Sequence, residues 1–144
     1  MSPSPVPAVI AVIVHEGRTL LVRRANPPDA GLWGFPGGKI EFGETVKDAA
    51  MRELLEETGV VAQAKDIITT LDILVRDPTG TMRQHYILIA VQCHWISGDP
   101  VAADDALDAR WFAIAELDPD RIPMSADVDV IARRAQALVS NPND

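Results

Sequence analysis

The chain has 144 residues, a formal net charge of -8 at pH 7, 47% hydrophobic residues and 24% charged residues. This length and composition fit one globular domain with its own core. The acidic balance argues against binding to a nucleic-acid duplex or to an anionic membrane surface. A lone cysteine, Cys93, leaves no internal disulfide to form and fits a reducing, cytoplasmic environment. No apolar run reaches the roughly 18 residues of a membrane span.

The first half of the chain begins with strands. Residues 1–5 are expected to form a disordered head, because Ser and Pro contribute little to a core. The apolar run 6–14 has neither a basic segment before it nor a small-residue cleavage site after it, so we interpret it as strand rather than signal peptide. Residues 8–15 are rich in β-branched side chains, which predicts a strand covered on both faces. A second strand is predicted over 19–24.

A helix is predicted after a loop at 26–34 and a short extended segment that contains Ile40. Thr45 is a good N-cap, and Asp48 stands where the acid of a capping box would reach back. Gly59 suits the left-handed residue that ends a helix. The sequence therefore predicts a helix between Thr45 and Gly59.

The second half of the chain predicts a hairpin and a closing helix. Strands are expected over 67–76 and 83–95, joined by the turn Asp77-Pro78-Thr79-Gly80. A loop or short helical turn at 104–109, a short strand at 110–112 and an amphipathic helix at 124–139 follow. Residues 141–144 are expected to be a frayed tail, which leaves one domain over 6–140. Strands interrupted by one helix and closed by another favour an α/β fold, an α/β/α sandwich around a mixed sheet.

The predicted central helix separates two kinds of side chain. At about 100° per residue, Ala50, Met51, Leu54 and Leu55 fall on one side. Three carboxylates, those of Glu53, Glu56 and Glu57, fall on another. Like charges at i,i+3 and i,i+4 repel, so this cluster favours a bound divalent cation. Oxygen ligands indicate Mg²⁺ or Mn²⁺, with Ca²⁺ as a further option and Zn²⁺ disfavoured.

The spacing around these carboxylates carries a family resemblance. The motif G-x5-E-x7-R-E-U-x-E-E-x-G-U, with U aliphatic, is complete from Gly38 through Glu44 and Arg52 to Val60. It resembles the Nudix box of the Nudix hydrolases, whose fold is an α/β/α sandwich with the box as a loop-helix-loop. The resemblance implies a metal-dependent enzyme that cleaves a diphosphate linkage with water.

The resemblance also implies roles for individual residues. Glu56 and Glu57 would be metal ligands, and Glu53 would be a ligand or the general base, two roles that the sequence leaves open. Arg52 would belong to the catalytic group by orienting a neighbouring glutamate. Two further residues would help at the metal: Gly38 by its backbone carbonyl, and Glu44 as an additional ligand or a brace for the loop. One more acid from outside the box is expected among Asp104, Asp105 and Asp108.

Substrate contacts are predicted on weaker grounds. Arg23 and Arg24 end the second strand, where one of them could hold a phosphate, since adjacent strand residues face opposite ways. Trp33 and Phe35 are candidates for stacking on a base, with core packing as the alternative, and Lys39 is a further candidate contact. Trp95 and Trp111 are assigned to the core.

Outside the box the chain is similar to bacterial ADP-ribose and ADP-sugar pyrophosphatases of the family. The similarity rests on residues 31–38, on the 77–80 turn with His85 and Tyr86 after it, and on residues 108–112. It implies a small-molecule nucleotide substrate, and similar enzymes often form homodimers. The alternatives are a pyrophosphohydrolase of (d)NTPs or oxidised nucleotides, an inert nucleotide-binding regulator, and a Ca²⁺-binding structural protein.

Overall fold

The structure is a computed structural model, and it describes residues 3–140. The expected frayed tail lies outside the described residues, as do the first two residues of the expected head. Residues 3–5 belong to no helix or strand. The strands are β1 (Val6–His15), β2 (Arg18–Arg24), β3 (Trp33–Gly34), β4 (Gly37–Lys39), β5 (Val61–Arg76), β6 (Met82–Ser97) and β7 (Ala106–Ala113). The helices are α1 (Val46–Thr58), the 3-10 helix η1 (Ile114–Glu116) and α2 (Val128–Ser140).

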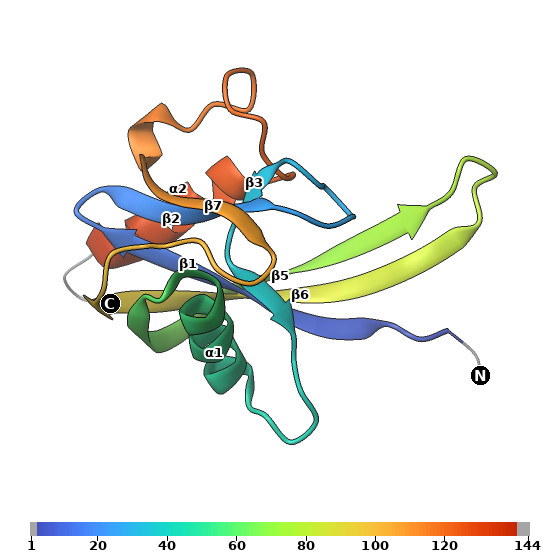
Figure 1. Cartoon of the computed structure of the whole chain (residues 1–144), viewed down its shortest axis with the longest axis horizontal. Coiled ribbons are helices and arrows are strands. Elements are labelled where there is room, and N and C mark those ends of the chain that lie inside the picture. Colours follow the sequence, from blue (N-terminus) through green and yellow to red (C-terminus); the bar gives the residue numbers. More distant parts are fainter. Residues whose placement is uncertain (1–2, 141–144) are drawn as a thin grey trace.

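The strands form one mixed sheet. Its main path runs in the order β3-β2-β1-β6-β5, with β4 paired to β1 and β7 paired to β2. The β1–β6 pairing is parallel and the other pairings are antiparallel. Figure 1 shows β1 running through the middle of the molecule, beside β6.

The two helices cover opposite faces of the sheet and make two cores. Alternate residues of β1 supply both: Val12 and Val14 pack with α2, whereas Ala11 and Ile13 pack with α1. This alternation follows from the two-residue period of a strand. It confirms that β1 is covered on both faces and that the chain folds as an α/β/α sandwich.

Helix α1 begins and ends at the expected residues. The Thr45 hydroxyl accepts a hydrogen bond from the Asp48 backbone N–H at 3.1 Å, which is the N-cap contact. Gly59 has φ 74° and donates its N–H to the carbonyl of Leu55 at 2.9 Å. The caps therefore fix which residues of the motif are helical.

Several boundaries differ from the sequence prediction. β5 begins at Val61 rather than residue 67, because its first residues pair with the end of β6. β7 begins at Ala106, so most of the predicted 104–109 loop is strand, held in register by β2. α2 begins at Val128 rather than residue 124, since Asp127 takes a left-handed φ of 66° that interrupts a helix. No helix among residues 3–140 is long and apolar enough to cross a membrane.

Candidate active site

The carboxylates of α1 lie partly on its buried side. Ala49, Ala50, Leu54 and Thr58 are buried, whereas Leu55 is 52% exposed. The prediction that Leu55 belongs to the apolar face is therefore wrong, because the sheet covers the helix on the Ala49–Ala50 side. Glu53 and Glu57 flank that buried stripe and are only partly exposed, while Glu56 faces solvent. Two of the three carboxylates consequently lie at the junction between the helix and the sheet.

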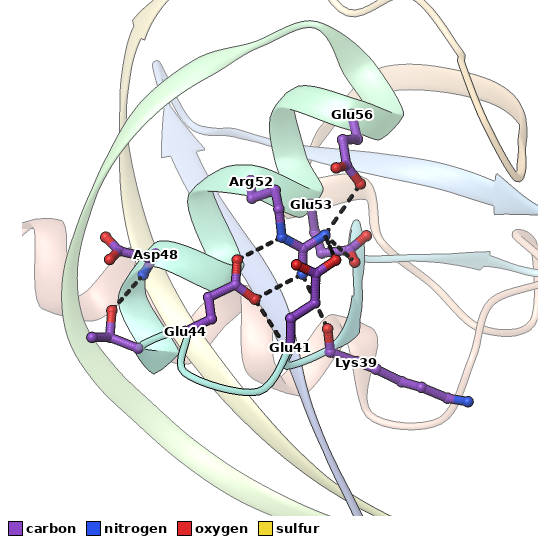
Figure 2. A network of polar contacts seen from close by, with 8 residues as sticks. Lys39, Glu41, Glu44, Asp48, Arg52, Glu53 and Glu56 are labelled. Atoms are coloured by element: carbon purple, nitrogen blue, oxygen red, sulfur yellow. Dashed lines mark hydrogen bonds and ion pairs between the residues drawn. The ribbon is translucent and has the colours of Figure 1, made fainter.

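Arg52 organises the solvent side of this cluster (Figure 2). Its guanidinium makes a bidentate pair with Glu44, with Nε to Oε2 at 2.6 Å and Nη2 to Oε1 at 2.9 Å. It also donates to Glu53 Oε1 at 2.9 Å, to Glu56 Oε2 at 3.2 Å and to the Lys39 carbonyl at 3.1 Å. One arginine therefore ties the loop before the helix to two of the candidate catalytic glutamates.

Glu44 braces the loop in the structure. Besides its pair with Arg52, its Oε1 accepts the Glu41 backbone N–H at 3.0 Å. The hydrogen bonds from Arg52 hold the pKa of the Glu44 carboxyl at about 2, well below its usual value. Both carboxylate oxygens are thus engaged by the protein itself. Of the two roles considered for Glu44, this geometry supports the brace.

Glu57 is the deepest of the three carboxylates. Its Oε2 accepts the Gly37 backbone N–H at 3.3 Å, which brings the helix against β4. Burial, reinforced by the nearby charge of Glu53, raises the pKa of Glu57 to about 8. Burial also raises the pKa of Glu53. Burial therefore disfavours the ionised form of both carboxyls in the protein alone.

The two glycines of β4 are required by close packing. A Cβ on Gly37 would lie 2.1 Å from the Val9 carbonyl oxygen, in the backbone of β1. A Cβ on Gly38 would lie 2.5 Å from Oε1 of Glu53. Because neither residue carries a Cβ, the backbone of β4 can approach the carboxylates and any group held there.

A cavity of about 660 Å³ opens beside these residues. Its acidic end contains Gly38, Glu53 and Glu57. Its lining also includes apolar residues from β5, β6 and the start of α2. The main apolar contributors are Leu71, Ile73, Tyr86, Leu88, Val128 and Ile131. One cavity therefore contains both a carboxylate cluster and an apolar surface that could contact an apolar or aromatic part of a ligand.

The cavity separates the predicted substrate contacts into two groups. Those that line it are Arg24, Phe35, Lys39 and, among the candidate extra acids, Asp105. Those outside its lining are Arg23, Trp33, Asp104 and Asp108. Arg23 and Arg24 do face different surroundings, as adjacent strand residues should: Nε of Arg23 donates to the Gly31 carbonyl, and that of Arg24 to the Pro28 carbonyl.

Trp33 and Asp108 have other partners in the structure. Trp33 is 7% exposed, packs edge-on against Phe112 and lies under the guanidinium of Arg110. Asp108 pairs with Arg110 at 2.7 Å, which lowers the pKa of its carboxyl. Core packing, the alternative considered for Trp33, therefore describes its position.

Sequence reasoning missed the apolar wall of the cavity and Glu41. Leu71 and Ile73 show only the two-residue period of any half-buried strand, so nothing local marks them as cavity residues. Glu41 lies within the motif loop, lines the cavity and approaches Arg52 at 3.8 Å. The signal available in the sequence was one more acidic residue inside the motif loop.

The oxygen donors fit a divalent cation by their electrostatics. Among residues 3–140, no three His, Cys, Asp or Glu side chains converge closely enough to form a ready-made metal cluster. Glu53 and Glu56 turn toward Arg52 instead, as Figure 2 shows. Burial raises the pKa values of Glu53 and Glu57, so their ionised forms are disfavoured unless a positive charge lies beside them. A hard cation held by carboxylates would supply that positive charge.

Comparison with known proteins agrees with this geometry. A family model for the NUDIX domain matches residues 4–133. An ADP-ribose pyrophosphatase of Methanocaldococcus jannaschii is 37% identical over 113 residues, which are 78% of this chain but only 64% of that relative. A putative 8-oxo-dGTP diphosphatase 2 of Mycobacterium tuberculosis is 36% identical over 142 residues, covering 94% of this chain and 93% of the relative.

A solved structure shares the same architecture. The crystal structure of a MutT NUDIX hydrolase from Burkholderia pseudomallei superposes with a TM-score of 0.77 at 28% identity, covering 91% of this chain and 98% of that one. The family model, the relatives and the shared fold all agree with the complete motif between Gly38 and Val60. The chain belongs to the Nudix family of hydrolases, whose members generally use divalent metal ions.

Proposed function

We propose that this Nudix protein hydrolyses the diphosphate linkage of a nucleoside diphosphate derivative, with ADP-ribose or an ADP-sugar as the leading substrate. The products would be AMP and a sugar phosphate. The observation that carries the proposal is the single cavity of about 660 Å³ that joins Gly38, Glu53 and Glu57 to an apolar wall. A diphosphate held at the acidic end would leave room for a base along that wall.

Glu56 and Glu57 are the proposed ligands of a Mg²⁺ or Mn²⁺ ion, with help from the backbone carbonyl of Gly38. Such an ion, when bound, polarises phosphoryl oxygens and lowers the pKa of a coordinated water. Glu53 is the proposed general base for the attacking water. Arg52 donates a hydrogen bond of 2.9 Å to Oε1 of Glu53, which orients the Glu53 side chain. Burial raises the pKa of the Glu53 carboxyl, which favours its use as a base.

Arg24, Phe35, Lys39 and Asp105 complete the proposed site, because each lines the same cavity. Arg24 lies close enough to lower the pKa of Glu57 and can pair with a substrate phosphate. Phe35 offers an apolar surface for a base or sugar. Asp105 is the proposed extra acid, since among the three candidates it alone both lines the cavity and contributes to the raised pKa of Glu57.

A second candidate function is hydrolysis of an oxidised or ordinary nucleoside triphosphate to the monophosphate and pyrophosphate. It is favoured by the resemblance to the putative 8-oxo-dGTP diphosphatase 2, which spans 93% of that relative. The ADP-ribose pyrophosphatase relative is matched over a smaller share of its length, 64%. Both proposed reactions would use the same carboxylates. They would differ in which part of the substrate, a sugar or a nucleoside, fills the rest of the cavity.

The decisive experiment is product analysis on a panel of ADP-ribose, ADP-sugars, 8-oxo-dGTP and dNTPs with Mg²⁺ or Mn²⁺. AMP plus ribose 5-phosphate supports the leading proposal, and pyrophosphate from a triphosphate supports the second. Glu53→Gln should abolish most turnover, and Glu116→Gln, an exposed acid on η1, is the matched control. Tight nucleotide binding without any turnover would overturn both proposals in favour of an inert regulator.

A further inference from the structure

Every hydrogen-bond donor of the Arg52 guanidinium is already in use. A guanidinium carries five N–H donors, one on Nε and two on each Nη. Nε and one Nη2 donor go to Glu44, at 2.6 Å and 2.9 Å, and the other Nη2 donor goes to the Lys39 carbonyl at 3.1 Å. The two Nη1 donors go to Glu53 at 2.9 Å and to Glu56 at 3.2 Å. No donor of Arg52 remains for a further acceptor.

The Glu41 carboxylate is a sixth acceptor beside this guanidinium. Its Oε1 lies 3.8 Å from Nη1 of Arg52, which is too long for a hydrogen bond, and Figure 2 shows the side chain pointing toward Arg52. Among residues 3–140 this carboxylate accepts no hydrogen bond, and its side chain is 69% exposed. The backbone of Glu41 is fixed, because its N–H donates to Glu44 Oε1 at 3.0 Å and its carbonyl accepts the Glu44 N–H at 2.9 Å. A free carboxylate is therefore held about 1 Å from hydrogen-bonding distance to Nη1.

A cation at the proposed site would disturb the guanidinium at its bond to Glu56. This bond, at 3.2 Å, is the longest of the five, and the Glu56 side chain is 46% exposed. A guanidinium and a divalent cation that share one carboxylate repel each other, so cation binding favours release of Glu56 from Arg52. The release leaves one Nη1 donor without an acceptor, and a charged donor without a partner lowers stability.

We propose that Glu41 is a positioning residue that replaces Glu56 on Nη1 of Arg52 when Glu56 turns to a divalent cation. The exchange keeps all donors of Arg52 occupied, so Arg52 stays in place and continues to orient Glu53. Because it makes the release of Glu56 less costly, Glu41 strengthens cation binding without touching the cation. The inference rests on the proposed function in that a cation binds at Glu56, and it holds for either substrate class.

Calorimetric titration of the full chain with MnCl₂, without substrate, tests this role. Glu41→Ala should raise the Mn²⁺ dissociation constant about fivefold, as expected for the loss of one charge-assisted hydrogen bond at an exposed site. Glu41→Gln keeps an acceptor oxygen and should raise the constant only about twofold. The matched control is Asp48→Asn, which removes the same charge from an exposed position on α1 that has no ion pair with Arg52 among the described residues. It should leave the constant unchanged.

Two further measurements separate this role from a structural one and from direct ligation. Without metal, Glu41→Ala should leave the free energy of unfolding in urea unchanged, because the side chain accepts no hydrogen bond in that state. The rise in Tm that MnCl₂ causes should be smaller in this variant than in the wild type. In an Arg52→Gln background, Glu41→Ala should no longer change the Mn²⁺ dissociation constant, because the donor it serves is absent.

Four results would overturn the proposal. An equal loss of affinity in Glu41→Ala and Glu41→Gln would show that charge alone matters. A full effect of Glu41→Ala in the Arg52→Gln background would show that Glu41 acts on the cation itself. Unchanged affinity in Glu41→Ala, with affinity lost in Glu56→Gln, would remove the role of Glu41 and leave the proposed function intact. A wild-type chain that binds no Mn²⁺ would remove the proposed cation site as well.

Discussion

Replacing Gly38 by Ala should separate catalysis from stability. A Cβ at this position would lie 2.5 Å from Glu53 Oε1 and 2.7 Å from its carboxyl carbon. To reach ordinary contact near 3.4 Å the carboxylate must withdraw by about 1 Å. Gly38 does not have a left-handed φ, so Ala fits its backbone. Only the end of a flexible side chain has to move, at a cost of about 1 kcal/mol.

The same displacement should be severe for the reaction. A misplacement of about 1 Å in a catalytic group can lower the rate about 10²-fold. We therefore expect Gly38→Ala to lose about 10²-fold in kcat, measured by steady-state kinetics on the substrate identified in the panel. Its free energy of unfolding in urea should fall only slightly.

Gly37→Ala provides the contrast. Its Cβ would lie 2.1 Å from the Val9 carbonyl oxygen, which is backbone of the central strand and cannot swing aside. This variant should therefore be strongly destabilised. Wild-type kcat in Gly38→Ala, or unfolding of Gly38→Ala to the same extent as Gly37→Ala, would refute the reasoning.

Three further variants test the carboxylates. Glu56→Gln should lower turnover by about 10²-fold or more and leave the circular dichroism spectrum unchanged, because the side chain is exposed; near-wild-type activity contradicts its assignment. Burial raises the pKa of Glu57 to about 8, so the stability that this group contributes is present below about 4.5 and lost as pH rises through about 8. Glu57→Gln should therefore raise Tm at pH 8 without added metal and abolish any rise in Tm caused by MgCl₂, and a lower Tm at pH 8 would contradict this. Arg52 lowers the pKa of Glu44 to about 2, so that pair's stability is present above about 4.5 and lost as pH falls through about 2. Glu44→Gln should consequently destabilise the protein more at pH 7 than at pH 3 in urea unfolding, and an equal loss at both values would count against the brace.

The order and type of most elements could be predicted because their signals are local. The caps Thr45 and Gly59 limit the helix through contacts with residues three or four positions away. The β-branched run of β1 indicated burial on both faces, which the two cores confirm. Boundaries set by distant partners were less predictable, as the early starts of β5 and β7 show. Their first residues become strand only because another strand lies alongside.

The helical wheel separated the carboxylates from the apolar residues but wrongly placed Leu55 among the covered side chains. Periodicity shows which side chains share a face, and hydrophobicity suggested that Leu55 would be covered. The sheet instead covers the Ala49–Ala50 side, where small residues allow the helix to come close. That approach is what buries Glu57 and brings it to the N–H of Gly37, 20 positions earlier in the chain.

By itself the sequence determined the family, because the motif is a set of fixed spacings around one helix and such spacings survive in the linear chain. Tertiary structure decided which residues share a cavity: Arg24 lies on it, and the adjacent Arg23 does not. The reason is that an adjacent pair on a strand differs only in which face it presents. That choice depends on the packing of the whole sheet and leaves no local trace in the order of the amino acids.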